Sequence, residues 1–182
     1  EIKYLVETMN NPVHPCTVIL GGSKIGDKIE LIDNIIEKTD TILIGGAMAF
    51  TFLKVQGKNV GSSLIDEENL EVAENILRLS EKSNTNLVLP VDVVASPELS
   101  HDTTWRVANL EELKDDEAGY DIGPETTMNF ELLLSGNKII VWNGPMGVFE
   151  IPAFSTGTQA IASAVRNQTK EGAVSIIGGG DT

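Results

Sequence analysis

The chain alternates short apolar runs with segments in which apolar residues recur at helical spacing. Each apolar run is four or five residues long and rich in Val, Ile and Leu, as in strands buried on both faces of a sheet. The predicted strands are 17–20, 41–44, 86–89, 138–142 and 173–177. A further extended stretch is expected at 91–95.

Helical patterns fill most of the intervals between these strands. Ile25, Ile29, Ile32 and Ile36 recur at the spacing of one helix face. The other predicted helices are one through Phe50 and Leu53, then 66–80, 124–134 and 155–165. Residues 96–118 have a weak pattern and many acids, so we expect them to be irregular or peripheral.

Strands that alternate with helices predict a definite architecture. Parallel neighbours need crossover connections, and right-handed crossovers place helices on both faces of the sheet. The expected fold class is therefore α/β, a Rossmann-like three-layer α/β/α sandwich with a mostly parallel sheet. Ligands of such folds bind beyond the carboxyl ends of the strands.

Composition and charge narrow the possible functions. The chain has 182 residues, 41% of them apolar and 22% charged, as in an ordinary globular protein. A net charge of −14 argues against binding to nucleic acid or to a membrane surface. The acid clusters are interpreted as solvated helix caps and faces. The single cysteine, Cys16, excludes an intrachain disulfide and is predicted to be a buried structural thiol in a reducing compartment.

Glycine marks the carboxyl end of nearly every predicted strand. Tight turns alone explain one or two such positions, whereas a series of them predicts a floor shaped for a ligand. The glycines concerned are Gly21 and Gly22, Gly45 and Gly46, Gly144, and Gly178 to Gly180.

The segment 141–150, with the sequence VWNGPMGVFE, is the most informative of these strand ends. A hydrophobic run stops at Asn143, which can both donate and accept hydrogen bonds, and Pro145 stiffens the turn that follows. Glu150 can accept two hydrogen bonds from a diol such as a ribose. A strand-to-helix loop that binds no ligand can also be rich in Gly and Pro.

The first glycine loop, 20–28, predicts an anion site. Its glycines expose backbone N–H groups, and the following helix presents its positive end. Lys24 and Lys28 are four residues apart, so we expect them to project from one face of the first helical turn. The loop is not a P-loop, because Asp27 stands where that motif has its lysine. The alternative is two surface lysines at a helix start.

Three further glycine segments are more ambiguous. Gly178 to Thr182 is typical of a strand end leading into a helix whose N-terminus holds phosphate, with Asp181 available to Mg²⁺, or of a simple helix cap. Segments 45–50 and 119–124 could line a slot for an adenine ring or could be packing. No nucleophile constellation is visible, but phosphoryl transfer needs only positioning, cations and Mg²⁺.

Taken together, these motifs resemble phosphoglycerate kinase, in that family's order and spacing. The resemblance covers essentially the whole chain. The segments that carry it are GGSK at 21–24 with Asp27 and Lys28, IGGAMAFTFLK at 44–54, DIGP at 121–124, 141–150, and GGGDT at 178–182.

The resemblance implies transfer of a phosphoryl group between 1,3-bisphosphoglycerate and ADP, giving 3-phosphoglycerate and ATP. It implies that Lys24 stabilises the transferring phosphoryl group together with Gly179, that Lys28 contacts the nucleotide phosphates, and that Asp181 holds Mg²⁺. The other implied nucleotide-binding positions are Gly22, Gly45, Gly46, Leu64, Gly119, Tyr120, Asn143, Pro145, Gly147, Val148, Glu150, Gly180 and Thr182.

The resemblance also implies a domain division. Residues 1–14 correspond to the end of an interdomain helix and the entry to the domain, and 15–182 to the C-terminal, nucleotide-binding domain. The N-terminal domain, which binds the phosphoglycerate, and the final C-terminal segment are missing from this sequence. We therefore expect the chain to bind Mg-ADP or Mg-ATP without turnover by itself. The full-length family implies a cytoplasmic, monomeric protein.

Two other function classes remain open at this point. A stand-alone module for adenine nucleotides would share the site but not the chemistry. A dinucleotide-binding dehydrogenase domain would share the fold, but the chain lacks a G-x-G-x-x-G sequence after its first strand and has lysines in that loop. Preference for ADP over NAD would discriminate between them.

Overall fold

The structure is a computed structural model that describes residues 11–179. Within these residues, five strands form a parallel sheet in the order β3-β2-β1-β7-β8. The strands are β1 (Cys16–Leu20), β2 (Thr41–Ile44), β3 (Asn86–Val88), β7 (Ile139–Asn143) and β8 (Val174–Gly178). All five predicted strands are confirmed, with ends that differ by at most a residue.

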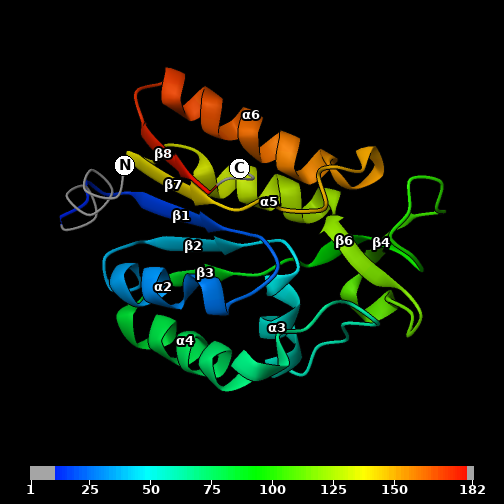
Figure 1. Ribbon diagram of the computed structural model, residues 1–182. Coiled ribbons are helices and arrows are strands. Elements are labelled where there is room, and N and C mark those ends of the chain that lie inside the picture. Colours follow the sequence, from blue (N-terminus) through cyan, green and yellow to red (C-terminus); the bar gives the residue numbers. More distant parts are fainter. Residues whose placement is uncertain (1–10, 180–182) are drawn as a thin grey trace.

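Helices cover both faces of this sheet, as Figure 1 shows. One face carries α2 (Ile29–Ile35), α3 (Met48–Val55) and α4 (Leu70–Ser83), and the other carries α5 (Pro124–Leu134) and α6 (Thr156–Lys170). The described chain also contains the short 3₁₀ turns η1 (Gly26–Lys28), η2 (Glu67–Asn69), η3 (Leu110–Glu112) and η4 (Pro152–Phe154). The predicted three-layer α/β/α fold is therefore confirmed.

The apolar strands bury both of their faces. On β1, Val18 and Leu20 point into the layer of α2, α3 and α4, while Ile19 points into the layer of α5 and α6. This alternation follows from the two-residue period of a strand. The sheet is therefore packed between two apolar cores.

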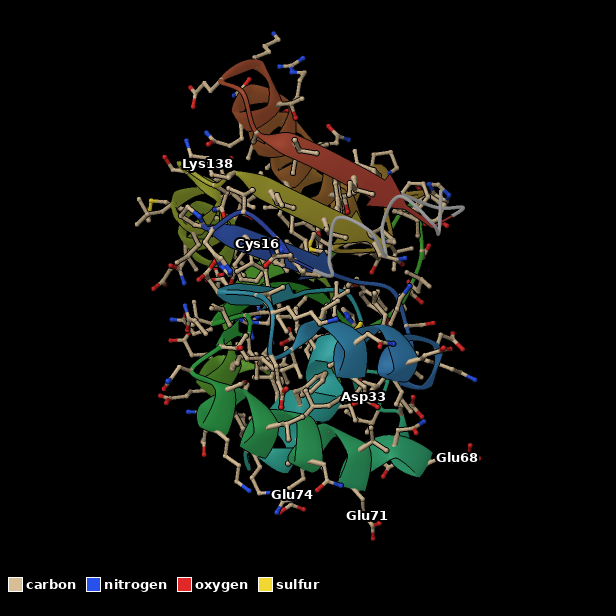
Figure 2. The ribbon with its side chains drawn as sticks, turned by 90° about the vertical axis from the view of Figure 1, so that its left-hand side faces the viewer. Cys16, Asp33, Glu68, Glu71, Glu74 and Lys138 are labelled. Carbon is tan, nitrogen blue, oxygen red and sulfur yellow. The ribbon has the colours of Figure 1, made fainter. Side chains whose placement is uncertain are left out.

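The prediction that Cys16 is a buried thiol is confirmed. Its side chain is fully buried at the start of β1, and Figure 2 shows it within the sheet. Burial, and then the nearby charge of Asp40, raise the pKa of the thiol to about 12. The group is therefore a packed, unreactive thiol at neutral pH.

A second sheet lies beside the carboxyl edge of the first (Figure 1). In the described part of the chain it is three-stranded and antiparallel, in the order β5-β4-β6. Its strands are β4 (Asp92–Ser96), β5 (Arg106–Asn109) and β6 (Ala118–Ile122). The extended stretch expected at 91–95 is thus confirmed as β4.

The prediction that 96–118 is irregular is wrong in part. The segment contains β5, in which Ala108 is buried while Val107 is 45% exposed, so no apolar period marks the strand. Pairing with β4 holds it instead. Strand β6 begins where this segment ends, and its glycine and buried Asp121 hide it from a hydrophobic pattern.

Most of the acid clusters are solvated, as predicted. Figure 2 shows Glu71 and Glu74 projecting outward from α4, and Glu68 from the turn before it. The described residues include no helix long and apolar enough to cross a lipid bilayer.

Candidate functional site

The candidate site lies at the point in the main sheet where the strand order reverses, between β1 and its two neighbours. Strand β1 pairs with β2 on one side and with β7 on the other, which is the arrangement that opens a crevice at the carboxyl ends of strands. Leu20 is opposite both Ile44 and Asn143, and Asn143 is opposite Gly178. The glycine loops that follow these strands therefore begin side by side at the carboxyl edge of the sheet.

Main-chain hydrogen bonds join the loops after β1, β2 and β7 into one floor. They run from Gly21 N–H to Asn143 O (2.9 Å), from Gly22 N–H to Pro145 O (3.0 Å), from Gly45 N–H to Leu20 O (2.8 Å), from Gly46 N–H to Met146 O (3.0 Å), and from Met48 N–H to Gly22 O (3.0 Å).

This close approach requires glycine at two positions in particular. A Cβ at Gly21 would collide with the carbonyl oxygen of Pro145. Gly46 has a φ of +64°, and a Cβ there would lie 2.5 Å from the carbonyl oxygen of Gly22. The interlocked loops thus account for glycine here whether or not a ligand is bound.

A cleft of about 440 Å³ opens above this floor. Volumes of this size suit a small-molecule ligand. The predicted residues that line it are Gly22, Gly46, Leu64, Gly119, Tyr120, Pro145, Gly147, Val148 and Glu150. Ser23, Ala47, Leu99 and Phe149, which were not predicted, line it as well.

The cleft is apolar at its mouth. Leu64, Leu99 and Phe149 line the cleft together and are 58%, 53% and 37% exposed, so apolar surface is grouped there in contact with solvent. Glycine backbone forms the adjoining walls, so a flat ring can approach the main chain closely. Glu150 is exposed and also lines the cleft. The arrangement suits a planar apolar group joined to a polar one.

Strand β6 supports the wall formed by the loop after β7. The Val148 N–H donates to the carbonyl oxygen of Tyr120 (2.8 Å), and the rings of Tyr120 and Phe154 lie 5.0 Å apart. Burial, and then the charge of Glu98, raise the pKa of Tyr120. The phenol is therefore neutral at physiological pH.

The structure brings together two predicted residues that are 115 positions apart in the sequence. The Lys28 ammonium donates a hydrogen bond to Oδ1 of Asn143, at the end of β7. Both side chains are half-buried. Burial lowers the pKa of Lys28, and the nearby charge of Asp27 opposes that shift. A cation is thus held between the strand ends of β1 and β7.

Lys24 occupies a different position from the expected one. The prediction that both lysines project from one helical turn is wrong, because η1 precedes α2 and the helix begins only at Ile29. Lys24 is exposed in the loop ahead of η1. It lines a second hollow of about 220 Å³, which shares Ser23 and Leu64 with the cleft.

The prediction that this loop exposes free backbone N–H groups is also wrong: those of Gly21 and Gly22 donate to the floor, and two more are occupied by a side chain. The N–H groups of Ile25 and Gly26 donate to Oδ2 of Asp66, at 3.1 and 3.3 Å. They are therefore already occupied by a carboxylate of the protein. The interpretation of the acids before α4 as helix caps is therefore wrong for Asp66. Neither η2 nor α4 has a side-chain cap, although Asp66 directly precedes η2.

Two other helix starts are occupied in the same way. Asp92 accepts from the N–H groups of Glu125 (3.0 Å) and Thr126 (2.7 Å) at the start of α5. Asp121 accepts from the N–H of Gly157 (2.7 Å) at the start of α6. Both aspartates are buried and lie on the small sheet. The positive ends of α5 and α6 therefore already face internal carboxylates.

Asp121 gives the fold a specific dependence on pH. Burial raises its pKa from 3.8 to about 7, although the N–H groups of Gly157 and Ile122 favour the ionised form. Because the pKa is raised on folding, the stabilisation due to this group is complete below about pH 4 and is lost as pH rises through about 7. The loss over that window is expected to be of the order of 4 kcal/mol.

Comparison with Asp121→Asn isolates this effect, since the amide resembles the protonated acid and does not titrate. Urea unfolding of both proteins from pH 4 to pH 8 should show the native free energy of unfolding falling relative to that of the variant. Curves that stay parallel over that range would contradict the assigned titration.

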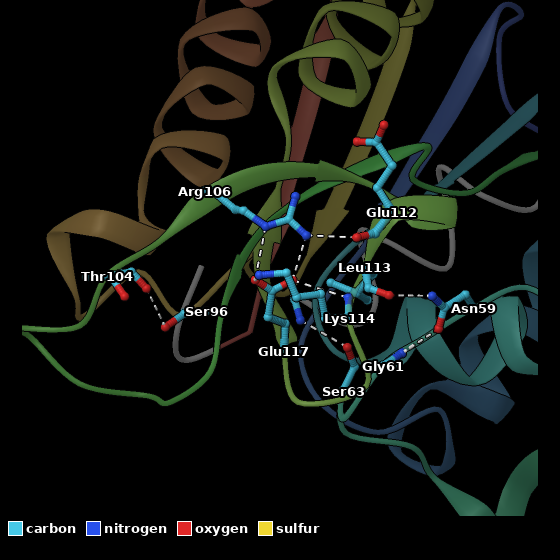
Figure 3. A network of polar contacts seen from close by, with 11 residues as sticks. Asn59, Gly61, Ser63, Ser96, Thr104, Arg106, Glu112, Leu113, Lys114 and Glu117 are labelled. Carbon is cyan, nitrogen blue, oxygen red and sulfur yellow. Dashed lines mark hydrogen bonds and ion pairs between the residues drawn. The ribbon is translucent and has the colours of Figure 1, made fainter.

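Figure 3 shows a polar network that supports another wall of the cleft. Glu117 accepts from Arg106 Nε (3.0 Å) and Nη2 (2.7 Å), and Arg106 also donates to the Glu112 carbonyl oxygen (2.8 Å). The hydrogen bond from Arg106 is the main cause that lowers the pKa of Glu117 to about 2. The interpretation of all acid clusters as solvated is wrong for Glu117, whose side chain is only 8% exposed.

This network is continuous with the cleft. The Glu117 carbonyl oxygen accepts from the Ser62 N–H (2.9 Å), and Ser63 Oγ accepts from the Gly119 N–H (3.0 Å). Gly119 itself and Leu64, the residue after Ser63, both line the cleft. These two hydrogen bonds join the two cleft walls, and the ion pair fixes the side chain of the residue that makes one of them.

The remaining predicted residues lie in different places. Gly45 is buried against Met146, under the floor. Gly179 is exposed just after β8, with a φ of +99°. Gly180, Asp181 and Thr182, and with them the predicted Mg²⁺ ligand, lie outside the described residues. Residues 11–179 hold no cluster of three or more His, Cys, Asp or Glu side chains suited to a metal.

Sequence signals existed for some of the unpredicted lining residues. Ser23, Ala47 and Phe149 belong to glycine segments that were already singled out. Leu99 lies in the segment predicted to be irregular, and nothing in the sequence pattern connects it with the cleft.

Comparison with known proteins gives a consistent result. The family model described as "Phosphoglycerate kinase" matches residues 1–182. Proteins called phosphoglycerate kinase from Chloroherpeton thalassium and Finegoldia magna are 46% and 48% identical to this chain over 182 residues. The match covers 100% of this chain and 46% and 45% of those proteins. The chain thus spans about half the length of these relatives.

Solved structures give the same picture. The phosphoglycerate kinase from Coxiella burnetii superposes with a TM-score of 0.93 at 42% identity, over 98% of this chain and 45% of that one. The phosphoglycerate kinase from Pyrococcus horikoshii superposes with a TM-score of 0.79 at 25% identity, over 99% of this chain and 50% of that one.

Proposed function

This chain belongs to the phosphoglycerate kinase family, and on that basis we propose that residues 15–182 are the nucleotide-binding half of such a kinase. The proposed reaction is phosphoryl transfer between 1,3-bisphosphoglycerate and ADP, giving 3-phosphoglycerate and ATP, in the cytoplasm. Residues 1–14 are proposed to lead from the interdomain helix into this half.

The proposal rests above all on the contact between Lys28 and Asn143. It holds a cation at the carboxyl edge of the sheet, between the loops that form the floor of an apolar cleft. An ammonium at that point can neutralise phosphate charge, while the cleft accepts a flat base. The combination matches the two chemically different ends of a nucleotide.

Individual roles follow from this arrangement. The base is proposed to lie between Leu64, Gly119 and the loop after β7, with the ribose hydroxyls at Glu150. Lys28 is proposed to contact the phosphates, exchanging its bond to Asn143 for phosphate oxygens. Lys24, whose side chain is exposed to solvent, is proposed to neutralise the charge that develops on the transferring phosphoryl group.

Mg²⁺ and the phosphoglycerate are proposed to bind outside residues 11–179. Mg²⁺ would neutralise phosphate charge, and Asp181 is proposed as its ligand. The family resemblance assigns the phosphoglycerate to a basic domain outside this sequence. We therefore propose that the chain alone binds nucleotide without turnover.

Dinucleotide binding is less well supported by the geometry. A pyrophosphate in such proteins binds the free N-terminus of the helix after the first strand. Here the Ile25 and Gly26 N–H groups at that point donate to Asp66. A stand-alone nucleotide module would share the cleft, and restored turnover on adding the other half of a family member would distinguish the kinase.

Calorimetric titration of this chain with ADP, with and without Mg²⁺, tests the proposed function. We expect saturable binding with a Kd of about 1 mM or tighter, equivalent to about −4 kcal/mol. NAD serves as the control ligand and should bind more weakly. Absence of ADP binding by a chain that circular dichroism shows to be folded, or preference for NAD, would contradict the proposal.

A further inference from the structure

We propose that Asp66 is a positioning residue that fixes the loop carrying Lys24 and Lys28 in the geometry that binds the phosphates of ADP. The inference rests on the proposed function of the cleft. It assigns a role to a carboxylate whose hydrogen bonds to backbone N–H groups go to the lysine loop and not to the helix that follows it.

Asp66 is held firmly in place by its own contacts. Its N–H donates to Oγ1 of Thr51 (2.9 Å), which is fully buried in α3. Its Oδ1 accepts from the side-chain amide of Asn69 (3.0 Å). The remaining oxygen, Oδ2, therefore faces the lysine loop from a fixed point.

The contact is made at the centre of that loop. Oδ2 accepts from the N–H groups of Ile25 (3.1 Å) and Gly26 (3.3 Å), which lie between the two lysines. The Ile25 side chain is fully buried, and its carbonyl oxygen accepts from the Lys28 N–H (2.7 Å). Fixing Ile25 thus fixes the backbone from which both Lys24 and Lys28 project.

The segment that carries Asp66 also reaches the other end of the cleft. Leu64 lines the cleft, and Ser63 accepts from the Gly119 N–H of the opposite wall (3.0 Å). One short stretch, 63–66, is therefore bonded to the wall proposed for the base and to the loop proposed for the phosphates. Asp66 sets the distance between them.

Charge makes this role testable by the direction of an effect. A carboxylate close to a phosphate site repels the ligand, so electrostatics alone predicts that its removal tightens ADP binding. A positioning role predicts the opposite. Glu67 and Glu68 line the same hollow as Asp66 and Lys24 and are exposed, so they provide acids of equal charge for comparison.

The experiment compares Asp66→Ala, Asp66→Asn and Glu67→Ala with the native chain, in ADP titrations followed by amide resonances. We expect Asp66→Ala to weaken ADP binding about tenfold, because the loop loses bonds to a charged acceptor. Asp66→Asn keeps an acceptor oxygen and should stay within about threefold of native. Glu67→Ala, which removes the same charge, should bind ADP as well as native or better.

A second measurement separates positioning from a general loss of structure. The amide protons of Ile25 and Gly26 should exchange faster in Asp66→Ala, while those of β1 and β2 keep their native protection. Equal or tighter ADP binding by Asp66→Ala, or equal weakening by the alanine and asparagine variants, would overturn the inference. Failure of the native chain to bind ADP would instead overturn the proposed function, and the inference with it.

Discussion

Replacement of Lys28 by methionine is expected to weaken ADP binding by roughly tenfold to a hundredfold, which corresponds to the approximately 1.5–3 kcal/mol of a charge-assisted hydrogen bond. Methionine keeps the length of the apolar stem and removes only the ammonium. The cation is half-buried at the strand ends and bonded to Asn143, so solvent screens it less than a surface lysine. Calorimetric titration of the variant measures the change in Kd.

Lys82→Met is the matched control, since it removes the same charge from an exposed position at the end of α4. That helix leads into the start of β3, at the edge of the sheet opposite the cleft. Its ADP binding should match that of the native chain. If both variants lose affinity equally, the effect belongs to net charge, and the assigned phosphate contact is wrong.

Gly46→Ala is expected to lower the free energy of unfolding by about 3 kcal/mol and to abolish ADP binding. The left-handed backbone at φ +64° costs a side chain about 1–2 kcal/mol. The added Cβ would also lie 2.5 Å from Gly22 O and 2.6 Å from Gly22 N, both backbone atoms tied into the floor, and such overpacking costs about 1–3 kcal/mol.

Gly57→Ala separates these two contributions. Gly57 has a similar φ of +72°, but a Cβ there meets nothing within 4 Å. The control should therefore lose only the backbone cost of about 1–2 kcal/mol and keep its ADP affinity. Urea denaturation of the three proteins gives the comparison, and equal losses for both variants would show that the floor is not tightly packed.

The main sheet and the location of the cleft could be predicted because both depend on local patterns. An apolar run predicts a buried parallel strand, and glycines after the run predict the turn that follows it. Parallel topology then brings those ends together, which is how Lys28 and Asn143 meet across 115 residues. Their individual contact was not predicted, but the edge on which it lies was.

The small sheet and the roles of particular acids depend on distant partners instead. Strand β5 exists because β4 pairs with it, and its own sequence has no strand period. Asp66 belongs to a run of acids in which its neighbours are solvated, and only the fold brings it to a loop 40 residues away. Glu117 likewise ends an acidic run and differs from it by facing Arg106.

The floor of the cleft is held by main-chain atoms, whereas its rim consists of side chains from separate segments. Leu64, Leu99 and Phe149 contribute to the mouth without belonging to the buried clusters of either sheet. If the cleft binds a base as proposed, exchanges at these three positions are expected to change which flat ring it prefers while the main-chain hydrogen bonds of the floor stay intact. Ligand selectivity and the stability of the fold would then depend on different residues. The selectivity could be redesigned at the rim without loss of the hydrogen bonds that hold the floor.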